Sequence, residues 1–289
     1  MAERILEIAG LWFWYEDEAA PVLRGLDLAV ERGEFLALVG ANGSGKTTLT
    51  KHFNGLLRPR RGSVRVNGED AGGRPVGELA RQVGYLFQNP EQQIFGPSVH
   101  EEVAFGPQNL GLTAREVEAR VEAALERFGL SDVAGSPPAI MGYGLRRRVT
   151  LASLAAMDPL ILVLDEPTVG LDARGLAETF DWLAELQAQG RTIVLVTHDM
   201  ALASKHADRV VVMCEGQILA SAPPIELFQQ RKLLLQASLA APPVLELAQA
   251  LMPWGMKGNS LTVGSFVDEY AALITTRAER GPGPAEATP

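Results

Sequence analysis

The fold is decided by one stretch, Gly40-Ala41-Asn42-Gly43-Ser44-Gly45-Lys46-Thr47, which fits the pattern G-x-x-x-x-G-K-[ST]. An apolar run over residues 35–39 predicts a buried strand before it, and residues 49–53 predict a helix after it. In this setting the glycines let backbone N–H groups converge on phosphate, and the helix N-terminus favours negative charge. The sequence therefore predicts a phosphate-binding loop, with Lys46 reaching the β- and γ-phosphates and the Thr47 hydroxyl ligating Mg²⁺.

The length and composition indicate a globular protein. With 289 residues, 47% of them hydrophobic, the chain can form one large α/β domain and a small appendage. No apolar run approaches the roughly 18 residues of a membrane span, and the first residues do not resemble a secretion signal. We therefore expect any membrane association to come through a partner. The single cysteine, Cys214, excludes an internal disulfide and is expected to be a small buried hydrophobe.

The charge argues against a nucleic-acid partner. The formal net charge is −9, whereas binding to a phosphate backbone requires clustered Lys and Arg. The one basic run, Arg146-Arg147-Arg148, is expected to be a solvated helix face.

Polar side chains follow three further apolar runs that predict buried strands. The runs cover residues 83–87, 160–164 and 192–197. Gln88 follows the first run and His198 the third, while Asp165 and Glu166 end the second. Because ligands bind at the carboxyl ends of strands in an open α/β sheet, we expect these residues to meet beside the phosphate loop. Two adjacent carboxylates there would be costly without a cation, so we expect Asp165 to face Mg²⁺ and Glu166 to face the attacking water.

An aromatic run, Leu11-Trp12-Phe13-Trp14-Tyr15, precedes the phosphate loop. Strand alternation would place Leu11, Phe13 and Tyr15 on one face and the two tryptophans on the other, so at least one ring should be exposed. From the residues alone, a role in the core and stacking on a purine remain equally open for this run.

The rest of the chain predicts a helical insertion and a smaller C-terminal part. Thr113 and Glu116 form a capping box before a helix, and a Gly- and Pro-rich loop over residues 135–144 leads into another helix near Leu145. A further helix covers residues 173–189. Later segments are a hairpin at 209–220, short helical segments at 245–251 and 266–274, and disorder at 281–284.

Taken together, the motifs resemble an ABC-type ATPase over roughly residues 4–225. They are the phosphate loop, Gln88, Asp165-Glu166-Pro167-Thr168, Gly170-Leu171-Asp172 and Thr197-His198-Asp199. The stretches at 87–95 and 99–106 are similar to the energy-coupling-factor branch, whose ATPases drive uptake of vitamins and of cobalt or nickel. The segment from Leu261 to Glu269 is similar to the C-terminal extension of those subunits.

This resemblance implies an α/β fold: a P-loop NTPase (RecA-like) parallel-sheet core with an N-terminal antiparallel β part, an inserted helical subdomain and a small C-terminal extension. The implied ranges are 4–228 for the ATPase domain, about 97–150 for the helical subdomain, 229–278 for the extension and 279–289 for a disordered tail.

The resemblance also implies a role for each matching residue. It implies ATP and Mg²⁺ as ligands, with ATP bound by Tyr15 as the base-stacking ring, by residues 40–48 including Thr48, and by Gln88. Thr47, Gln88 and Asp165 would surround Mg²⁺. Glu166 would polarise water, His198 would sense the γ-phosphate, and Asp172 would contact the opposite subunit.

One motif departs from the family pattern Leu-Ser-Gly-Gly-Gln. The signature falls on Met141-Gly142-Tyr143-Gly144-Leu145, where Gly142 lacks a hydroxyl, Tyr143 is bulky where close backbone approach is wanted, and Leu145 replaces an amide. A looser loop could still offer its backbone amides. We expect an asymmetric heterodimer in which a partner ATPase with an intact signature completes this chain's site.

The resemblance therefore implies an ATP-hydrolysing subunit of a membrane importer, peripheral at the cytoplasmic face and held by an integral coupling subunit and a substrate-binding membrane subunit. A mainly regulatory ATP-binding subunit is the alternative, and another importer class is a second. A soluble ABC protein of DNA repair or translation is disfavoured, because the long insertions of such proteins are missing from the sequence.

Overall fold

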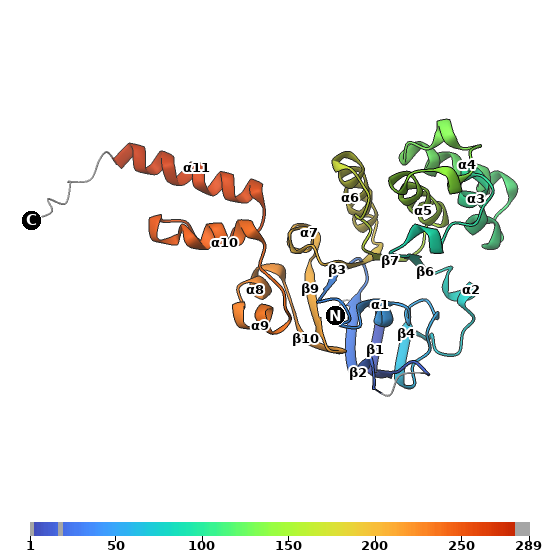
Figure 1. The fold of residues 1–289 in the computed structure, drawn as a ribbon, viewed down its shortest axis with the longest axis horizontal. Coiled ribbons are helices and arrows are strands. Elements are labelled where there is room, and N and C mark those ends of the chain that lie inside the picture. The colour runs from blue at the N-terminus through green and yellow to red at the C-terminus, as the bar shows by residue number, and fades with distance from the viewer. Residues whose placement is uncertain (1–2, 17–19, 281–289) are drawn as a thin grey trace, which may run out of the picture.

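The computed structural model describes residues 3–16 and 20–280, and the expected disorder at 281–284 lies outside them. Two sheets form the centre of the structure, a helical lobe lies on one side of them, and the last two C-terminal helices extend on the other (Figure 1). This arrangement is the α/β architecture that the sequence predicts.

The central sheet is parallel except for its last strand. Its order is β10-β9-β3-β8-β7-β6, and only the β9 and β10 pair is antiparallel. The strands are β3 (Phe35–Val39), β6 (Val83–Leu86), β7 (Ile161–Asp165), β8 (Thr192–Val196), β9 (Arg209–Cys214) and β10 (Gln217–Ala222). Every residue of β3, β7 and β8 is buried, as expected for apolar strands covered on both faces.

The register of this sheet brings the polar strand ends together. Leu38 pairs with Val196 between β3 and β8, and Asp165 pairs with Val196 between β7 and β8. The phosphate loop, Asp165 and His198 therefore emerge at one edge of the sheet. This confirms the convergence of these three strand ends that the apolar runs predict.

A second, antiparallel sheet packs beside the first in the order β2-β1-β4-β5. Its strands are β1 (Arg4–Phe13), β2 (Leu23–Glu31), β4 (Arg61–Val66) and β5 (Glu69–Asp70). The sequence elements named above do not include β2. Its signal is the alternation of buried Leu26, Leu28 and Val30 with more exposed residues.

The helical subdomain consists of α3 (Val99–Asn109), α4 (Ala114–Arg127) and α5 (Tyr143–Met157). The capping box of Thr113 and Glu116 is present at the start of α4. Helix α5 begins at Tyr143, within two residues of the predicted start near Leu145, and Gly142 has the extended conformation of an N-cap residue. The altered signature is therefore the N-terminus of α5.

The remaining helices connect the strands or form the C-terminal extension. They are α1 (Lys46–Thr50), α2 (Val76–Leu79), α6 (Ala173–Ala188), α7 (Met200–His206), α8 (Pro224–Phe228), α9 (Arg231–Gln236), α10 (Pro243–Ala250) and α11 (Val263–Arg280). Short 3₁₀ turns lie at Pro90–Gln92, Ser131–Val133, Pro138–Ile140 and Met252–Trp254. Helix α11 is longer than the segment predicted at 266–274.

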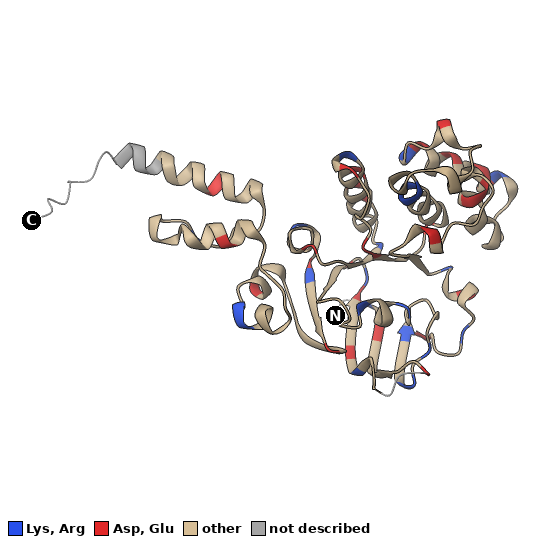
Figure 2. Cartoon of the chain, in the orientation of Figure 1, with Lys and Arg blue, Asp and Glu red and all other residues tan. Residues whose placement is uncertain are grey.

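Charge and hydropathy of the described residues agree with the composition. Figure 2 shows acidic and basic residues interspersed along the strands of the sheets and the helices of the helical lobe. Within residues 3–16 and 20–280, no helix has the length and hydropathy to cross a bilayer. Cys214 is half-buried rather than buried, with its sulfur 3.8 Å from the carbonyl oxygen of Gln236.

Candidate nucleotide-binding site

The phosphate loop wraps around the N-terminus of α1. Gly45 is the N-cap, with a left-handed backbone (φ 100°), and a Cβ there would lie 2.8 Å from Leu23 Cδ2, so only glycine fits. No side chain caps the helix, which leaves its first N–H groups free for an anion.

Lys46 lies folded under this loop. Its Nζ donates to the carbonyl oxygens of Gly40 at 2.8 Å and of Ala41 at 3.0 Å. Burial lowers the pKa of Lys46, while the nearby Glu166 and Asp165 carboxylates raise it. A buried cation that is satisfied mainly by carbonyls gains much from an anion placed beside it.

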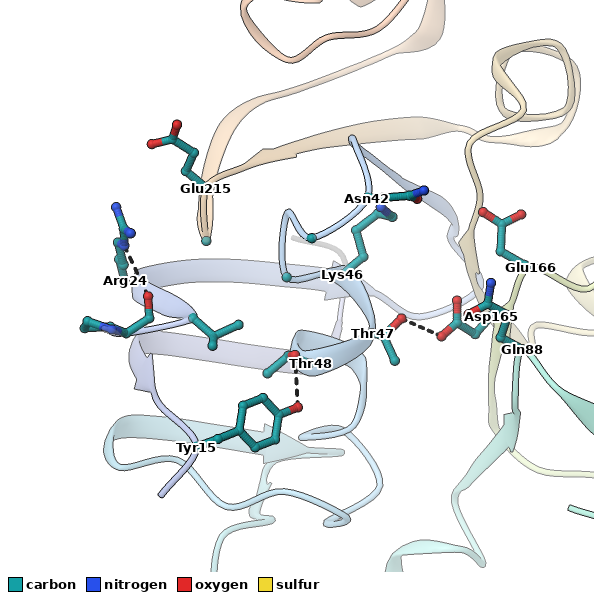
Figure 3. Close-up of a pocket in the computed structure, with 15 residues that line it drawn as sticks. Tyr15, Arg24, Asn42, Lys46, Thr47, Thr48, Gln88, Asp165, Glu166 and Glu215 are labelled. Atoms are coloured by element: carbon teal, nitrogen blue, oxygen red, sulfur yellow. Dashed lines mark hydrogen bonds between the residues drawn. The ribbon is translucent and has the colours of Figure 1, made fainter. Parts of the chain in front are cut away.

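Thr47 and Asp165 form the centre of a candidate magnesium site. Thr47 Oγ1 donates to Asp165 Oδ2 at 2.7 Å, and Figure 3 shows Gln88 beside this pair. Burial is the main cause that raises the pKa of Asp165, and the Thr47 hydrogen bond opposes it. The described residues contain no cluster of three or more His, Cys, Asp or Glu side chains suited to a metal, so a cation here needs oxygens from phosphate and water.

Tyr85 supports Asp165 from beneath. Its hydroxyl lies 3.5 Å from Asp165 Oδ2 and 3.0 Å from Thr50 Oγ1. Burial raises the pKa of Tyr85, so the hydroxyl stays protonated and can donate. Tyr85 was not among the predicted site residues.

Glu166 turns away from Asp165, as the sequence predicts for the end of a strand. Its backbone is left-handed (φ 48°), which re-aims a side chain that is only 10% exposed. Glu166 Oε1 accepts from the backbone N–H of His198 at 3.0 Å and lies 2.7 Å from His198 Nδ1. Glu166 Oε2 has only a 3.4 Å contact with Thr197 Oγ1, so it can accept from a water.

The aromatic run divides between core and site. Leu11 and Phe13 are buried, whereas Tyr15 lies beyond the end of β1 and is 37% exposed. The Tyr15 ring meets Phe13 edge-on at 4.9 Å, and its hydroxyl is 3.2 Å from Thr48 Oγ1. Tyr15 therefore borders the loop and is partly exposed.

A cavity of about 810 Å³ connects Tyr15 and the phosphate loop with Gln88, Asp165 and Glu166 (Figure 3). Tyr15 marks one end, and Asp165 with Glu166 marks the other. The sequence did not assign several lining residues to the site, namely Pro21, Val22, Arg24, Glu215 and Gly216. Pro21 and Val22 lie directly before β2, Arg24 lies on β2, and Glu215 and Gly216 form the β9–β10 turn. Only the tertiary fold brings them to the loop.

A second hollow, of about 750 Å³, lies on the other side of the phosphate loop. His198, Glu166 and Asn42 line it together with residues 238–241 of the C-terminal part. His198 thus faces this hollow and is absent from the lining of the first. Such a position suits a group that meets the terminal phosphate from the side.

The signature residues form a separate place in the structure. Gly144, Leu145 and Asp172 line a hollow of about 310 Å³ and contribute nothing to the larger cavity. Met141 is buried, and Gly142 caps α5 without a side-chain hydrogen bond. Asp172 accepts from the N–H of Gly175 at 2.7 Å, and this hydrogen bond lowers its pKa. The signature hollow and the larger cavity are therefore separate in this chain.

The expectation of a solvated basic run is wrong for its central residue. Arg147 is fully buried, and its guanidinium donates to the carbonyl oxygens of Phe87 at 2.7 Å and of Gln88. Arg146 and Arg148 are partly exposed and pair with acidic side chains. Periodicity could have signalled this, because Arg147 lies four residues before the buried Leu151 on α5.

The Tyr143 side chain makes contacts within its own chain. It turns back onto its own chain, where the hydroxyl donates to Gln88 O at 3.2 Å. Its ring packs against Gly170.

Comparison with known proteins identifies the family to which the sequence is similar. Residues 23–169 match the family model described as ABC transporter. An energy-coupling factor transporter ATP-binding protein, EcfA, of Methanocaldococcus jannaschii is 43% identical over 249 residues, which is 86% of this chain and 89% of that protein. An EcfA of Methanothermobacter thermautotrophicus is 40% identical over 273 residues, covering 93% of this chain and 88% of the relative.

A solved structure shares the fold. It is cbiO1 from Clostridium perfringens, described as part of the ABC transporter complex cbiONQ. The sequence identity is 34% and the TM-score is 0.69, over 82% of this chain and 96% of that one.

Proposed function

The chain belongs to the ABC transporter family, and from this premise we propose that it binds and hydrolyses ATP to energise a membrane importer of the energy-coupling-factor type. The observation that carries the proposal is the Thr47 to Asp165 hydrogen bond of 2.7 Å beside Lys46 and Glu166 in one cavity. The relatives named EcfA support the importer class. Uptake of a vitamin or a transition metal is the corresponding transport reaction.

We assign the hydrolysis of ATP to the residues at the Asp165 end of the cavity. The free N–H groups at the start of α1 bind phosphate oxygens, and Lys46 Nζ exchanges its carbonyl partners for the β- and γ-phosphates. Water attacks the γ-phosphorus while the bond between this phosphorus and the β–γ bridging oxygen breaks, which releases ADP and inorganic phosphate. Glu166 first accepts a hydrogen bond from the attacking water and then takes its proton. His198 contacts the γ-phosphate from the second hollow.

The donor set at Thr47 and Asp165 fits Mg²⁺, because a buried carboxylate and a hydroxyl already lie within hydrogen-bond distance and Gln88 adds an amide oxygen. A bound Mg²⁺ would neutralise negative charge on the phosphates. Asp165, Thr47 and Gln88 would hold it.

At the other end of the cavity, the adenine base stacks on Tyr15. Its ring is 37% exposed and is already fixed by Phe13 and Thr48, so stacking costs little ordering of the side chain. Arg24 and Glu215 border the same end and are available to the sugar.

The active form is a dimer with a second ATPase. The signature hollow around Gly144 lies apart from the cavity of the same chain, so each nucleotide needs a signature from the other subunit. Because Gly142 and Leu145 lack the hydroxyl and amide of the family pattern, a partner with an intact signature makes the productive site here. The pair is peripheral at the cytoplasmic face, held by an integral coupling subunit and a substrate-binding membrane subunit.

The Glu166→Gln variant, in the complex with its partner ATPase and membrane subunits, tests this function. We expect ATP hydrolysis to fall on the order of 10²- to 10⁴-fold, since the base is lost, while ATP binding persists. A Glu246→Gln change on the exposed face of α10 is the matched control, with activity within twofold of the original. If Glu166→Gln hardly changed hydrolysis, the chain would instead be a mainly regulatory ATP-binding subunit.

A further inference from the structure

The backbone and the side chain of Tyr143 lie toward different parts of the molecule. It is the first residue of α5, so its backbone N–H belongs to the uncapped N-terminus that a partner's nucleotide would meet. Its side chain points the other way and reaches the turn after β6. A glycine, which the family pattern has at this position, could not make the second contact.

Tyr143 is held against its own chain by a hydrogen bond and a tight contact. The hydroxyl donates to Gln88 O at 3.2 Å. A Cβ added to Gly170, whose φ is +83°, would lie 2.2 Å from the Tyr143 ring, and a Cβ on Gly144 would lie 2.7 Å from Gly170 O. The start of α5 and the turn at Gly170 therefore fit together only because glycines stand at the contact.

Arg147, one helical turn later, reinforces the same contact. Its guanidinium donates to Phe87 O at 2.7 Å and also to Gln88 O. It lies 3.4 Å from the Tyr143 hydroxyl and 5.9 Å from the centre of the Tyr143 ring. A fully buried cation with these partners fixes two successive carbonyls of the turn.

The turn that α5 holds also carries a cavity residue. Gln88 presents its carbonyl to Tyr143 and Arg147, while its side chain lies beside Asp165 (Figure 3). Any displacement of the α5 N-terminus therefore moves the Gln88 amide relative to the Thr47 and Asp165 pair. No other element is needed to connect the two.

We propose that Tyr143 is a positioning residue that clamps the Gln88 turn from the signature end of α5 and so couples the partner's nucleotide to this chain's own phosphate site. The coupling depends on the dimeric ATPase proposed above. The clamp itself is a property of the single chain. The altered signature thus acquires a contact within its own subunit in place of the one it lost.

The Tyr143→Phe variant tests the clamp in the isolated chain. The ring remains on Gly170, while the hydroxyl that donates to Gln88 O and contacts Arg147 at 3.4 Å is lost. Hydrogen–deuterium exchange should become about 3- to 10-fold faster across residues 87–93, as expected for one lost hydrogen bond. Tyr270→Phe on α11 is the control and should leave this exchange unchanged. Unchanged exchange in Tyr143→Phe would overturn the clamp.

Steady-state kinetics of the assembled complex test the coupling. We expect Tyr143→Phe to lower kcat about 3- to 10-fold with KM for ATP within twofold of its original value, because the clamp positions Gln88 and does not bind the nucleotide. An unchanged kcat, or a rise in KM alone, would contradict the coupling. Tyr143→Gly should lower kcat at least as much, and a gain in activity would show that Tyr143 obstructs the signature instead.

The two measurements separate the two proposals. Exchange in the isolated chain needs neither ATP nor a partner, so it reports the clamp even if the assembled complex failed to hydrolyse ATP. A complex that hydrolyses ATP but is insensitive to Tyr143→Phe would leave the proposed function standing and refute the coupling.

Discussion

The phosphate loop and the altered signature are both helix N-termini with a glycine N-cap and no side-chain cap, yet they offer very different chemistry. At α1 the free N–H groups are joined by Lys46, Thr47 and the buried Asp165. At α5 they are joined by the exposed, apolar Leu145 and by Tyr143, whose hydroxyl is turned inward.

The comparison teaches that a helix dipole alone does not make a phosphate site. Free N–H groups contribute a modest, screened attraction, whereas charged donors and a metal ligand supply the larger share. We therefore expect changes at the α1 side to abolish function and changes at the α5 side to adjust it.

Lys46→Ala should have the largest effect. Loss of a charge-assisted hydrogen bond to phosphate costs about 1.5–3 kcal/mol, so ATP affinity should fall on the order of 100-fold and hydrolysis should become undetectable. Calorimetric titration with ATP measures the affinity. Lys205→Ala, on the exposed face of α7, is the matched control. Retained affinity in Lys46→Ala would mean that the N–H groups suffice, and the two helix ends would then be equivalent.

The double change Gly142→Ser and Leu145→Gln should make the N-terminus of α5 a better phosphate-binding site and so more similar to the N-terminus of α1. A new hydroxyl donor to the partner's phosphate contributes roughly 1.5 kcal/mol, so ATP hydrolysis by the isolated chain should rise about tenfold. The rate should depend on the square of protein concentration where the homodimer is weak. Brisk hydrolysis by the unchanged chain alone would argue that its signature already works.

Tyr15→Ala tests the far end of the cavity, where the expected effect is smaller. Stacking of a base on an aromatic ring contributes about 1–3 kcal/mol, so ATP affinity should fall roughly tenfold. Tyr15→Phe loses only the hydroxyl contact to Thr48 and should bind ATP within twofold of the original. Equal loss in both variants would assign the role to the hydroxyl.

The sequence could predict the phosphate-loop side because its contacts are local or set by strand ends. The G-x-x-x-x-G-K-[ST] spacing places Lys46 and Thr47 on one turn, and apolar runs predict where Asp165 and His198 emerge. The β2 strand and the Arg24 and Glu215 side of the cavity depend on tertiary pairing across distant segments.

The signature side was less predictable because its contacts cross between loops. Arg147 occupies a basic run that favours exposure, and burial becomes possible only where Phe87 and Gln88 present two carbonyls. The Tyr143 side chain could point outward or inward at the start of a helix. The choice depends on Gly170, a residue 27 positions away in a separate turn.

A matched pair of variants, Asp165→Asn beside the phosphate loop and Asp172→Asn beside the signature, tests how the charge of each aspartate affects folding stability. The expected effects are the smallest of those predicted. Burial raises the folded-state pKa of Asp165, so the stability linked to its protonation is present below the unfolded pKa and is lost as pH rises through the folded pKa. The hydrogen bond from Gly175 lowers the pKa of Asp172, so that stability is present above the unfolded pKa and is lost as pH falls through the folded pKa.

At pH 7 without nucleotide, Asp165→Asn should therefore raise Tm by roughly 2–4 °C, the shift that each kcal/mol gives in a chain of this size. Asp172→Asn should lower Tm slightly, because Asn still caps α6 but has no charge. Calorimetric scans from pH 7 toward pH 4 should show the Asp165→Asn difference shrinking, because the raised pKa lets Asp165 become protonated in the original chain. The Asp172→Asn difference should persist over this range, because the pKa of Asp172 is lowered and its carboxylate stays ionised. A lower Tm for Asp165→Asn at pH 7 would mean that the buried, ionised Asp165 carboxylate does not destabilise the folded chain. Neutralising that carboxylate would then contribute nothing to the free energy of binding Mg²⁺ and ATP.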